Sequence, residues 1–493
     1  MCELCVATQN FDPQRHGPLG TLVRPDPDPD PVPEPLPTGT FEALSNYLTA
    51  GFWADYDETP RSFAANPGNA SDYVITVNLT ELTFEGQRLA RWALDTWELM
   101  ADVQFIETES GGDIVVDDDE SGAFVQYQVS EDTGGNILVA NVNVDVNWIA
   151  AYGATLDSYA FTAYVHEFGH ALGLGHLGNY NLNTGSATFA NDSRQLSVMS
   201  YIQQDQSAST DASFAFPAAP MLVDVAAIQS IYGASGATSG DTTWGQGGAM
   251  SRHFATLYAG VDDGDDSTEE ADPITFTLFE ASGGGTDTID LRPSTTNDRL
   301  NLNGGSFSDI GGLIGNLTIA DGSEFENATM GSGRDTVIGN GLDNVLRGQD
   351  GGDYLSGGSG EDRLLGGAGR DRLFGGAMND RLLGHKGRDR LDSGEGDDVM
   401  IGGAGADAFF FGFGHDSDKI KDFTLGKDEL LFSAIDFEDM SAQELVDSFG
   451  RVDSKGVVLD FGDSEVLGAD YNDRLTLIGV FDLDALVDDI SFI

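Results

Sequence analysis

A nine-residue repeat constrains the fold of this chain more than any other feature of its sequence. Between residues 335 and 407 an acidic or amide residue stands at every ninth position, and an apolar residue follows two places later. The acidic and amide positions are Asp335, Asn344, Asp353, Asp362, Asp371, Asp380, Asp389, Asp398 and Asp407. The apolar positions are Val337, Leu346, Leu355, Leu364, Leu373, Leu382, Leu391, Met400 and Phe409. This pattern predicts a stack of equal coils whose apolar residues point inward.

The glycines and aspartates of the repeats indicate that the stack binds Ca²⁺. Residues 357–365 read GGSGEDRLL, so a glycine-rich turn carries Asp362 and a short strand follows. Carboxylates and turn carbonyls supply the oxygen ligands that Ca²⁺ prefers. Without a cation the stacked carboxylates repel one another and the inward side chains are too few to fold the segment, so we expect calcium-linked folding. A disordered Gly/Asp linker would not keep nine repeats in register.

Individual repeats deviate from the pattern. Asn344 replaces an acid, and Met378 and His385 replace turn glycines. These copies predict weak or empty calcium sites.

Composition agrees with cation binding and excludes several partners. The 493 residues include 82 Asp+Glu and 24 Lys+Arg, a net charge of -58. This balance excludes nucleic acid as a natural partner and argues against anionic membranes. No apolar run reaches the ~18 residues of a membrane span, and the first residues lack the basic and apolar regions of a signal peptide. Only two cysteines are present, so no disulfide framework is expected.

A second pattern, FTAYVHEFGHALGLGH at residues 161–176, indicates a metal site. His166 and His170 are one helical turn apart and project from the same face, with Glu167 beside them. Gly173 can end and reverse the helix, which would bring His176 back as a third nitrogen ligand. Three histidines and a water form a tetrahedral Zn²⁺ site with an open position, the catalytic rather than the structural arrangement. Isolated core or surface histidines would not show this combined spacing.

These motifs together resemble the serralysin-type secreted zinc endopeptidases, which are metzincins. The resemblance rests on H-E-x-x-H-x-x-G-x-x-H, on the sequence SVMSY at residues 197–201 and on the nonapeptides, and it covers residues 41–493. It implies that Met199 is the Met-turn residue beneath the metal and that Tyr201 approaches the zinc and the tetrahedral intermediate. It also implies that the nonapeptides form an RTX parallel β-roll. Leu177 departs from the family, which usually has proline there, so the path of the following loop is open.

We therefore expect an α+β metzincin catalytic domain followed by an all-β parallel β-roll. The expected parts are an N-terminal extension or propeptide with a proline-rich linker (1–40), the zinc protease domain (41–240), a β-rich lead-in (241–330), the RTX roll (331–411) and a C-terminal β region with a type I secretion signal (412–493). Apolar periodicity predicts helices at 86–100 and 222–233. Beta-like runs predict strands at 73–77, 103–106, 113–116 and 141–144. Residues 122–128 are either a plain sheet strand or an edge strand to which a peptide can add.

The two ends of the chain leave alternatives open. Cys2 and Cys5 are either an inert pair on a flexible tail or latency thiols that fill the open zinc position, since zinc takes sulfur readily. Residues 488–493 (DDISFI) are either an ordinary terminal strand or, by resemblance, the uncleaved signal of a type I secretion substrate.

The motifs and the resemblance predict a secreted, extracellular zinc endopeptidase that is stabilised by calcium. Glu167 is the expected general base and Tyr201 the expected hydrogen-bond donor to the oxyanion. The expected partners are protein or peptide substrates and the type I secretion machinery, and the chain is expected to be a monomer. A calcium-binding adhesin with a vestigial protease domain is a second hypothesis, disfavoured by the intact Glu167. An RTX toxin is a third, disfavoured because pore-forming apolar helices are absent.

Overall fold

The chain forms two compact units. The computed structural model describes residues 36–65, 73–130, 132, 135–180, 186–245, 274–280, 285–292, 294–437, 440–462 and 473–493. Cys2, Cys5 and the linker up to residue 35 therefore lie outside the described residues. The first unit contains Met1–Ala237 and Pro273–Phe279, and the second contains Thr238–Asp272 and Glu280–Ile493.

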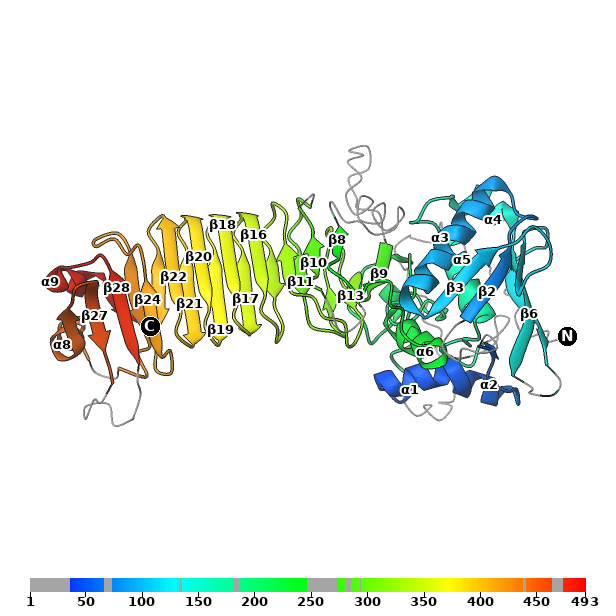
Figure 1. The fold of residues 1–493 in the computed structure, drawn as a ribbon, viewed down its shortest axis with the longest axis horizontal. Helices are drawn as coiled ribbons and strands as arrows, with labels where there is room; N and C mark the ends of the chain where they lie inside the picture. The colour runs from blue at the N-terminus through cyan, green and yellow to red at the C-terminus, as the bar shows by residue number, and fades with distance from the viewer. Residues whose placement is uncertain are drawn as a thin grey trace, which may run out of the picture. The chain divides into compact units, whose positions relative to one another are not determined.

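The first unit combines helices with a mixed sheet (Figure 1). Its helical elements are α1 (Phe41–Asn46), the π-helix η1 (Tyr47–Gly51), α2 (Phe52–Asp55), α3 (Phe84–Met100), α4 (Val146–Tyr152), α5 (Tyr159–Ala171), the 3₁₀ helix η2 (Gln204–Gln206) and α6 (Leu222–Tyr232). Its strands are β1 (Ser62–Phe63), β2 (Tyr73–Asn78), β3 (Val103–Glu107), β4 (Ile114–Asp117), β5 (Ala123–Val129), β6 (Asn136–Val144), β7 (Phe216–Pro217) and β9 (Ile274–Leu278).

The sheet of the first unit presents one strand at its edge. Five strands run parallel in the order β1-β6-β4-β2-β3, and β5 pairs antiparallel with β6. Among the described strands β5 has no second neighbour, which confirms the edge position of the predicted strand at 122–128. The other four predicted strands correspond to β2, β3, β4 and the end of β6.

Helix α3 packs against α5, the helix that carries the histidine motif. The indole N–H of the fully buried Trp97 donates to the Val165 carbonyl at 3.0 Å. The ring of Trp92 meets the edge of Phe161 at 6.4 Å between centroids. The Thr83 hydroxyl accepts the Gly86 N–H and begins α3, so the predicted helix at 86–100 is confirmed. The predicted helix at 222–233 is confirmed as α6.

The second unit is a parallel β-roll built from two sheets, as predicted (Figure 1). The first sheet contains β8 (Thr243–Gly245), β10 (Thr288–Asp290), β14 (Asn327–Thr329), β16 (Val345–Gly351), β18 (Arg363–Gly369), β20 (Arg381–Gly387), β22 (Val399–Ala404), β24 (Ser417–Ile420), β28 (Arg474–Ile478), β27 (Gly456–Asp460) and β26 (Gly450–Val452). The second sheet contains β11 (Arg299–Asn301), β15 (Thr336–Ile338), β17 (Tyr354–Ser359), β19 (Arg372–Ala377), β21 (Arg390–Glu395), β23 (Ala408–Phe411), β25 (Glu429–Phe432) and β29 (Ile490–Phe492). A short hairpin joins β12 (Phe307–Ser308) to β13 (Leu317–Ile319).

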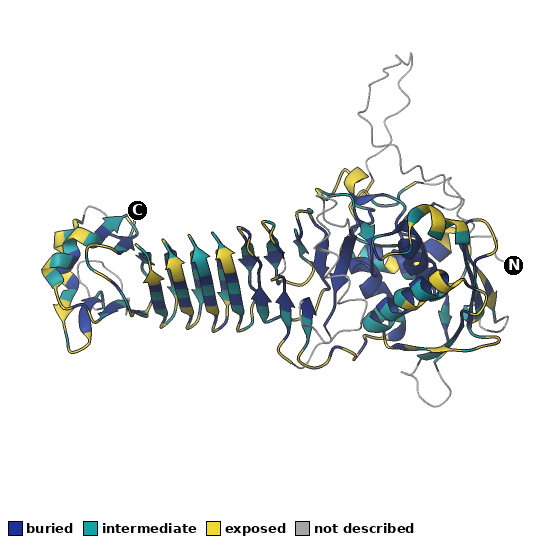
Figure 2. Cartoon of the chain, turned by 90° about the horizontal axis from the view of Figure 1, so that it is seen from above, coloured by how far each residue is buried: buried dark blue, intermediate teal, exposed yellow. Residues whose placement is uncertain are grey.

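Eighteen residues complete one coil and contribute one strand to each sheet. Leu346, Leu364 and Leu382 therefore align across the first sheet, and Leu355 and Leu373 across the second. These leucines are fully buried between the sheets, as the nine-residue spacing predicts (Figure 2). Side chains of the same strands that point away from the interior are partly or fully exposed.

Two sets of stacked turns connect the sheets. We call the turns between β14 and β15, β16 and β17, β18 and β19, β20 and β21, and β22 and β23 the first edge of the roll. The second edge consists of the turns between β15 and β16, β17 and β18, β19 and β20, and β21 and β22. Gln349, Met378 and His385 occupy turn positions with φ of 76°, 78° and 73°, so they take the left-handed conformation normally left to glycine.

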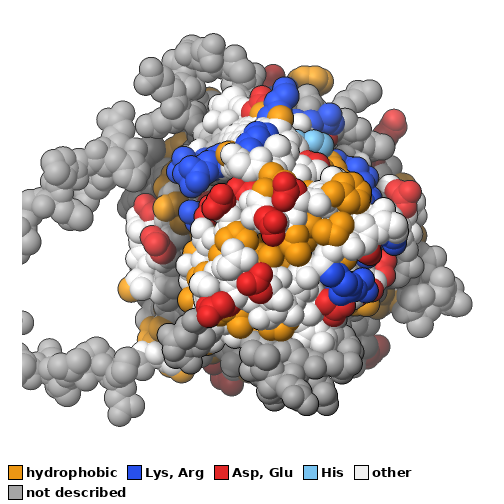
Figure 3. Space-filling view, turned by 90° about the vertical axis from the view of Figure 1, so that its left-hand side faces the viewer, with side chains coloured by type: hydrophobic (Ala, Val, Ile, Leu, Met, Phe, Trp, Pro, Cys, Tyr) orange, Lys and Arg blue, Asp and Glu red, His pale blue; other side chains and the backbone are white. Residues whose placement is uncertain are grey.

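The C-terminal part departs from the purely β-rich region that we predicted. It includes α8 (Ala442–Phe449), α9 (Leu483–Leu486) and the 3₁₀ helix η3 (Val487–Asp489). The Ser441 hydroxyl accepts the Glu444 N–H and begins α8. Acidic and hydrophobic side chains alternate over the end face of this region (Figure 3). Ile490–Phe492 form β29, which pairs with β25, so the chain ends in an ordinary strand in the folded state.

Among the described residues, none of the helices combines the length and apolarity that crossing a membrane requires.

Candidate metal centre

Helix α5 and the turn after it bring three imidazoles together. His166, His170 and His176 are buried, and each offers a ring nitrogen within 4.8 Å of the other two. The Nε2 atoms of His170 and His176 are 3.0 Å apart. The Nδ1 atom of His166 lies 2.8 Å from the Val198 carbonyl, and that of His170 lies 2.8 Å from the Leu174 carbonyl. These carbonyls hold Nδ1 protonated and leave the Nε2 lone pairs of both rings free to bind a metal.

The protonation states of the site suit a cation. Burial lowers the pKa of His170 to about 4. Burial and the neighbouring imidazoles also lower the pKa of His176 well below its ordinary value, and burial with the nearby His170 does the same for His166. All three rings are therefore neutral near pH 7 and can act as ligands. Burial raises the pKa of Glu167 well above its ordinary value, and its Oε2 has no partner among the described residues.

Gly173 reverses the chain so that His176 can return to the helix. Its φ of 107° ends α5, as predicted, and the Leu174 N–H donates to the Gly169 carbonyl at 3.0 Å. A Cβ atom at Gly173 would also lie 2.1 Å from the Arg61 carbonyl oxygen. Glycine is therefore required by both the backbone conformation and the close packing.

The loop that carries Met199 passes directly beneath α5. A Cβ atom at Gly169 would lie 2.6 Å from the Met199 Sδ, so only glycine lets this fully buried methionine approach. The carboxylate of Asp224, on α6, holds the loop: it accepts the Ser197 hydroxyl at 2.5 Å and the Val198 N–H at 2.6 Å. It also accepts the N–H of Met221 at 2.8 Å.

Tyr201 lies beside the histidines at the end of the same loop. Its ring centroid is 4.6 Å from that of His176, and it stacks on Tyr180 at 4.8 Å. The Tyr201 N–H donates to the Tyr180 hydroxyl at 3.1 Å. Leu177, the departure from the family pattern, is fully buried and its N–H donates to the Met199 carbonyl at 3.4 Å. Proline has no N–H for this bond, so leucine adds a contact between the third histidine and the Met199 loop.

A pocket with about 320 Å³ of empty space opens beside Glu167. Its walls include Ala123 of the edge strand β5, Thr162 of α5, Tyr201 and Arg194. The Arg194 guanidinium is buried; its Nε donates to the Ser200 carbonyl at 3.1 Å, while its Nη1 has no partner among the described residues. The pocket thus joins the metal-binding face to a strand edge and a buried cation.

The aspartates of the roll form one ladder along each edge. Each Oδ1 accepts the backbone N–H of the equivalent residue one coil earlier, as Asp371 does from Asp353 at 2.9 Å. The remaining oxygen of each carboxylate is buried and lacks a partner among the described residues; these Oδ2 atoms belong to Asp298, Asp335, Asp353, Asp362, Asp371, Asp380, Asp389, Asp398 and Asp407. Rows of orphaned carboxylate oxygens are the donor set that Ca²⁺ takes. Asn344 differs, because its carboxamide pairs with Asn340.

Burial makes these carboxylates reluctant to ionise without a cation. Burial raises the pKa of Asp362 and Asp389 to about 6, of Asp335, Asp371 and Asp398 to about 7, and of Asp380 to about 8. Neighbouring aspartates of the ladder raise several of them further.

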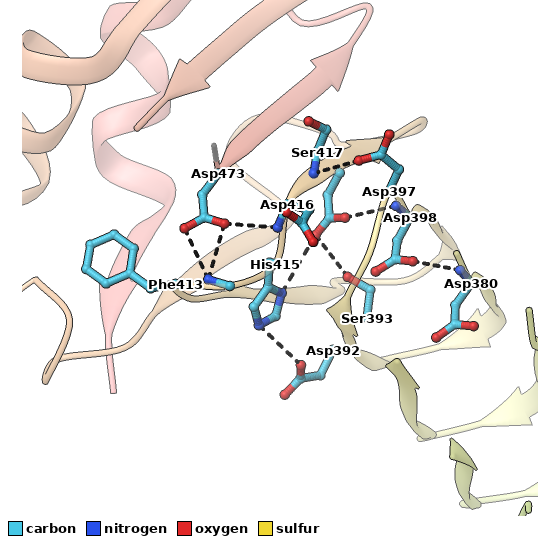
Figure 4. A network of polar contacts seen from close by, with 12 residues as sticks. Asp380, Asp392, Ser393, Asp397, Asp398, Phe413, His415, Asp416, Ser417 and Asp473 are labelled. Carbon is cyan, nitrogen blue, oxygen red and sulfur yellow. Dashed lines mark hydrogen bonds and ion pairs between the residues drawn. The ribbon is translucent and has the colours of Figure 1, made fainter. Parts of the chain in front are cut away.

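The ladders end on aspartates whose second oxygen is occupied. Asp418 accepts the Asp398 N–H at 3.0 Å, and its Oδ2 accepts the Ser393 hydroxyl at 3.0 Å and lies 3.7 Å from His415. His415 also approaches Asp392 at 4.0 Å (Figure 4). Asp428 ends the ladder of the first edge in the same way, since its Oδ2 accepts the Thr424 N–H. At the C-terminal end of each ladder, protein groups thus contact the second carboxylate oxygen, which stays unpartnered in the preceding ladder aspartates.

Comparisons with known proteins agree with this geometry. Residues 237–469 match the family described as Peptidase M10 serralysin C terminal. The chain is 36% identical over 276 residues to the Metalloprotease AprA of Pseudomonas entomophila (strain L48), covering 52% of this chain and 54% of that protein. It is 39% identical over 246 residues to Serralysin B of Dickeya chrysanthemi, covering 43% and 48% of the two chains. The chain is related to the serralysin-type proteases of peptidase family M10. It spans about half the length of the curated relatives it matches.

Several residues of the site and of the ladders were missed by the sequence analysis. Asp224 and Arg194 belong to no short motif, and only the fold brings them to the Met199 loop and the pocket. Asp298, Asp418 and Asp428 extend the ladders but stand 37, 20 and 21 residues from their partners, so a search at nine-residue spacing does not find them.

Without calcium, the thermal stability of the roll should fall as the pH rises. Because the folded pKa of the ladder aspartates is raised, the folded state binds more protons than the unfolded chain between about pH 4 and 8. With a chelator, the thermal midpoint should therefore fall as pH rises from 5.5 to 8. With excess Ca²⁺, which binds the ionised form, the midpoint should be higher at pH 8 than in chelator at any of these values. A chelated sample that gains stability towards pH 8 would contradict this account.

Substituting Asp224 should loosen the Met199 loop. Asp224→Ala leaves the Ser197 hydroxyl and two backbone N–H groups without an acceptor, which should cost about 3 kcal/mol or more in the stability of the first unit. Urea unfolding and the metal content of the purified protein measure the effect. Asp211→Ala, at an exposed position of the same unit, is the control and should leave both unchanged.

Proposed function

We propose that the chain is a secreted zinc endopeptidase whose first unit is a metzincin-type catalytic domain. The observation that carries the proposal is the convergence of three neutral imidazoles beside a buried glutamate that lines an open pocket. His166, His170 and His176 would hold Zn²⁺, which supplies a Lewis acid and a water of lowered pKa when bound. The metalloprotease relatives support this activity.

Glu167 acts as the base of the proposed reaction. Its carboxylate adjoins the imidazoles, and the unpartnered Oε2 is free to accept a proton from the attacking water. The raised pKa lets the same group return the proton to the leaving amine. Tyr201 also lines the pocket and donates its hydroxyl hydrogen bond to the oxyanion of the tetrahedral intermediate.

The edge strand β5 positions the substrate. Ala123 places one end of β5 at the pocket, and the outer side of the strand has no described neighbour. A peptide substrate in an extended conformation adds to this edge through main-chain hydrogen bonds, which do not depend on the identity of its side chains.

The second unit has two roles in the proposed enzyme: it binds calcium, and its C-terminal residues direct export. Aspartate ladders with free oxygens bind several Ca²⁺ ions, so the second unit folds where calcium is abundant. The C-terminal residues, including β29, act as the type I secretion signal before the chain folds, and the secreted protein works as an extracellular monomer. Cys2 and Cys5 remain candidate latency thiols outside the described residues.

The decisive test replaces the base and leaves the ligands in place. Glu167→Gln should lower casein hydrolysis by about 10²–10⁴-fold, because the water loses its proton acceptor, while one zinc per chain is retained. Metal analysis and peptide digestion of the same preparation measure both quantities. Glu85→Gln, at an exposed site on α3, should behave as the wild type. Full activity of the Glu167 variant would remove this residue from the mechanism.

The role of Tyr201 predicts a selective loss of turnover. Tyr201→Phe keeps the ring that stacks on Tyr180 but lacks the hydroxyl, so kcat should fall about tenfold or more while KM changes little. Steady-state kinetics on a fluorogenic peptide distinguish the two constants. Tyr73→Phe, in β2, is the matched control, and an unchanged kcat for Tyr201→Phe would contradict the assignment.

A further inference from the structure

The first edge of the roll concentrates positive charge in a chain that is otherwise strongly acidic. The whole sequence has 24 Lys+Arg against 82 Asp+Glu. Five of these cations lie in or directly after the turns of the first edge, and a sixth, Lys386, lies at the end of β20 just before such a turn; the five are Arg334, Arg370, Arg372, Arg388 and Arg390. Of the six, Arg390 is half-buried and the others are exposed, whereas Asp350 is the one exposed acid in the described part of these turns. We call these six residues the basic edge.

The second edge of the roll carries acidic residues at the positions that are basic on the first edge. At the position before each ladder residue, where the first edge has Arg370 and Arg388, the second edge has Asp343, Glu361 and Asp397. The repeat itself would allow any polar residue at these exposed positions. The roll is therefore electrostatically asymmetric: Arg363 and Arg381 directly follow turns of the second edge, but exposed acids stand in turns of that edge, whereas cations predominate on the first edge.

The cations of the basic edge do not neutralise the ladder. No member of the basic edge has a described carboxylate within 4.0 Å, in contrast to Arg299, which lies 2.8 Å from Asp309. The ladder carboxylates keep their Oδ2 atoms unpartnered although guanidinium groups stand in the adjacent turns. Arg372 and Arg390 instead align with each other in neighbouring parallel strands, roughly 4.8 Å apart. Arg372 is exposed and available to an external anion, whereas Arg390 is half-buried and its guanidinium lies 5.6 Å from the centre of the Phe410 ring.

An exposed aromatic residue continues the same row. Tyr354 of β17 aligns with Arg372 of β19, which aligns with Arg390 of β21, and these strands lie side by side (Figure 1). The Tyr354 ring is 37% exposed and packs on Phe374 at 5.1 Å, which fixes its orientation. The row therefore presents an apolar face, then the exposed Arg372 and then the half-buried Arg390, at aligned positions of neighbouring strands.

The positive surface extends to the other side of the same turns. Arg347, His385 and Lys386 contribute to a groove with about 740 Å³ of empty space between the first sheet and the first edge. Burial and the nearby Arg363 lower the pKa of Arg347 while Asp290 raises it, and Asp350 is the acid that lines the same groove.

We propose that the basic edge binds an acidic polysaccharide that lies across strands β17, β19 and β21. Guanidinium groups pair bidentately with carboxylates, and a regular row of them matches a polymer that carries one anion per sugar at intervals. Tyr354 offers the apolar face of a rigid ring to a sugar ring at the end of the row. Single-stranded DNA is the competing polyanion that the test includes, because phosphates also pair with guanidinium groups.

Calcium bound in the ladders makes the basic edge more positive, a point that rests on the proposed calcium binding. The aspartates beneath the basic edge, such as Asp371 and Asp389, offset part of its charge when they are ionised and free. Ca²⁺ bound to them removes this offset, so the basic edge becomes most positive in the folded, calcium-loaded roll.

The test uses the full-length chain with excess Ca²⁺ and short oligogalacturonate as the probe. Titration calorimetry should show saturable binding of oligogalacturonate that weakens with added salt, and none of a neutral maltooligosaccharide of the same length. Arg372→Gln/Arg390→Gln should weaken binding by about tenfold or more because it removes two bidentate contacts. Tyr354→Ala should weaken it without changing the salt dependence.

The roll supplies a matched control on its other sheet. Arg363→Gln/Arg381→Gln removes two exposed arginines that align in the same way on β18 and β20, and it should change the affinity less than about twofold. Equal losses in the two double variants, equal binding of single-stranded DNA, or no saturable binding would each overturn the proposal. Calcium-dependent melting of both variants shows that the roll is folded, and their casein hydrolysis reports the proposed protease function separately.

Discussion

Buried ligand atoms without a protein partner are the constraint on which both units of this chain depend. In the first unit three imidazoles are packed so that a ring nitrogen of each lies within 4.8 Å of the other two. In the second, rows of carboxylate oxygens are buried with nothing to pair with. An isolated buried charge is costly, and the shifted pKa values of both sites favour the neutral groups. Both sites therefore have the donor atoms that the proposed Zn²⁺ and Ca²⁺ binding requires.

At the metal centre, several close contacts hold helix α5 and the Met199 loop in place. The α5 helix can approach the Met199 loop because Gly169 has no side chain, and the chain can return to the helix because Gly173 accepts a positive φ. The Asp224 carboxylate accepts the Val198 N–H of the loop, and the Leu177 N–H donates to the Met199 carbonyl. These contacts join elements from distant parts of the sequence. A change at any one of them would displace the ligands without touching the metal-binding atoms themselves.

The sequence predicts the parts of this structure that repeat or that lie within one helical turn. His166 and His170 share a helix face, and the leucines at nine-residue spacing are fully buried, because both relations depend on local geometry alone. Contacts that need a tertiary arrangement were not predictable. Asp224 lies 26 residues beyond Val198, and nothing in its helix marks it as a hydrogen-bond acceptor for a loop. Helix α8 was missed because the surrounding segments are β-like, although its capping box at Ser441 and Glu444 is visible in the sequence.

The eighteen-residue period of the roll decides how such a chain can change in length. Each coil hydrogen-bonds only to the coils before and after it, as the pairing of Asp353, Asp371 and Asp389 shows. Gain or loss of eighteen residues would therefore preserve all remaining pairings and both end structures. Gain or loss of nine would instead transfer every downstream strand to the opposite sheet and every downstream turn to the opposite edge. Duplications in whole coils conserve the asymmetry between the edges, whereas those of half a coil invert it.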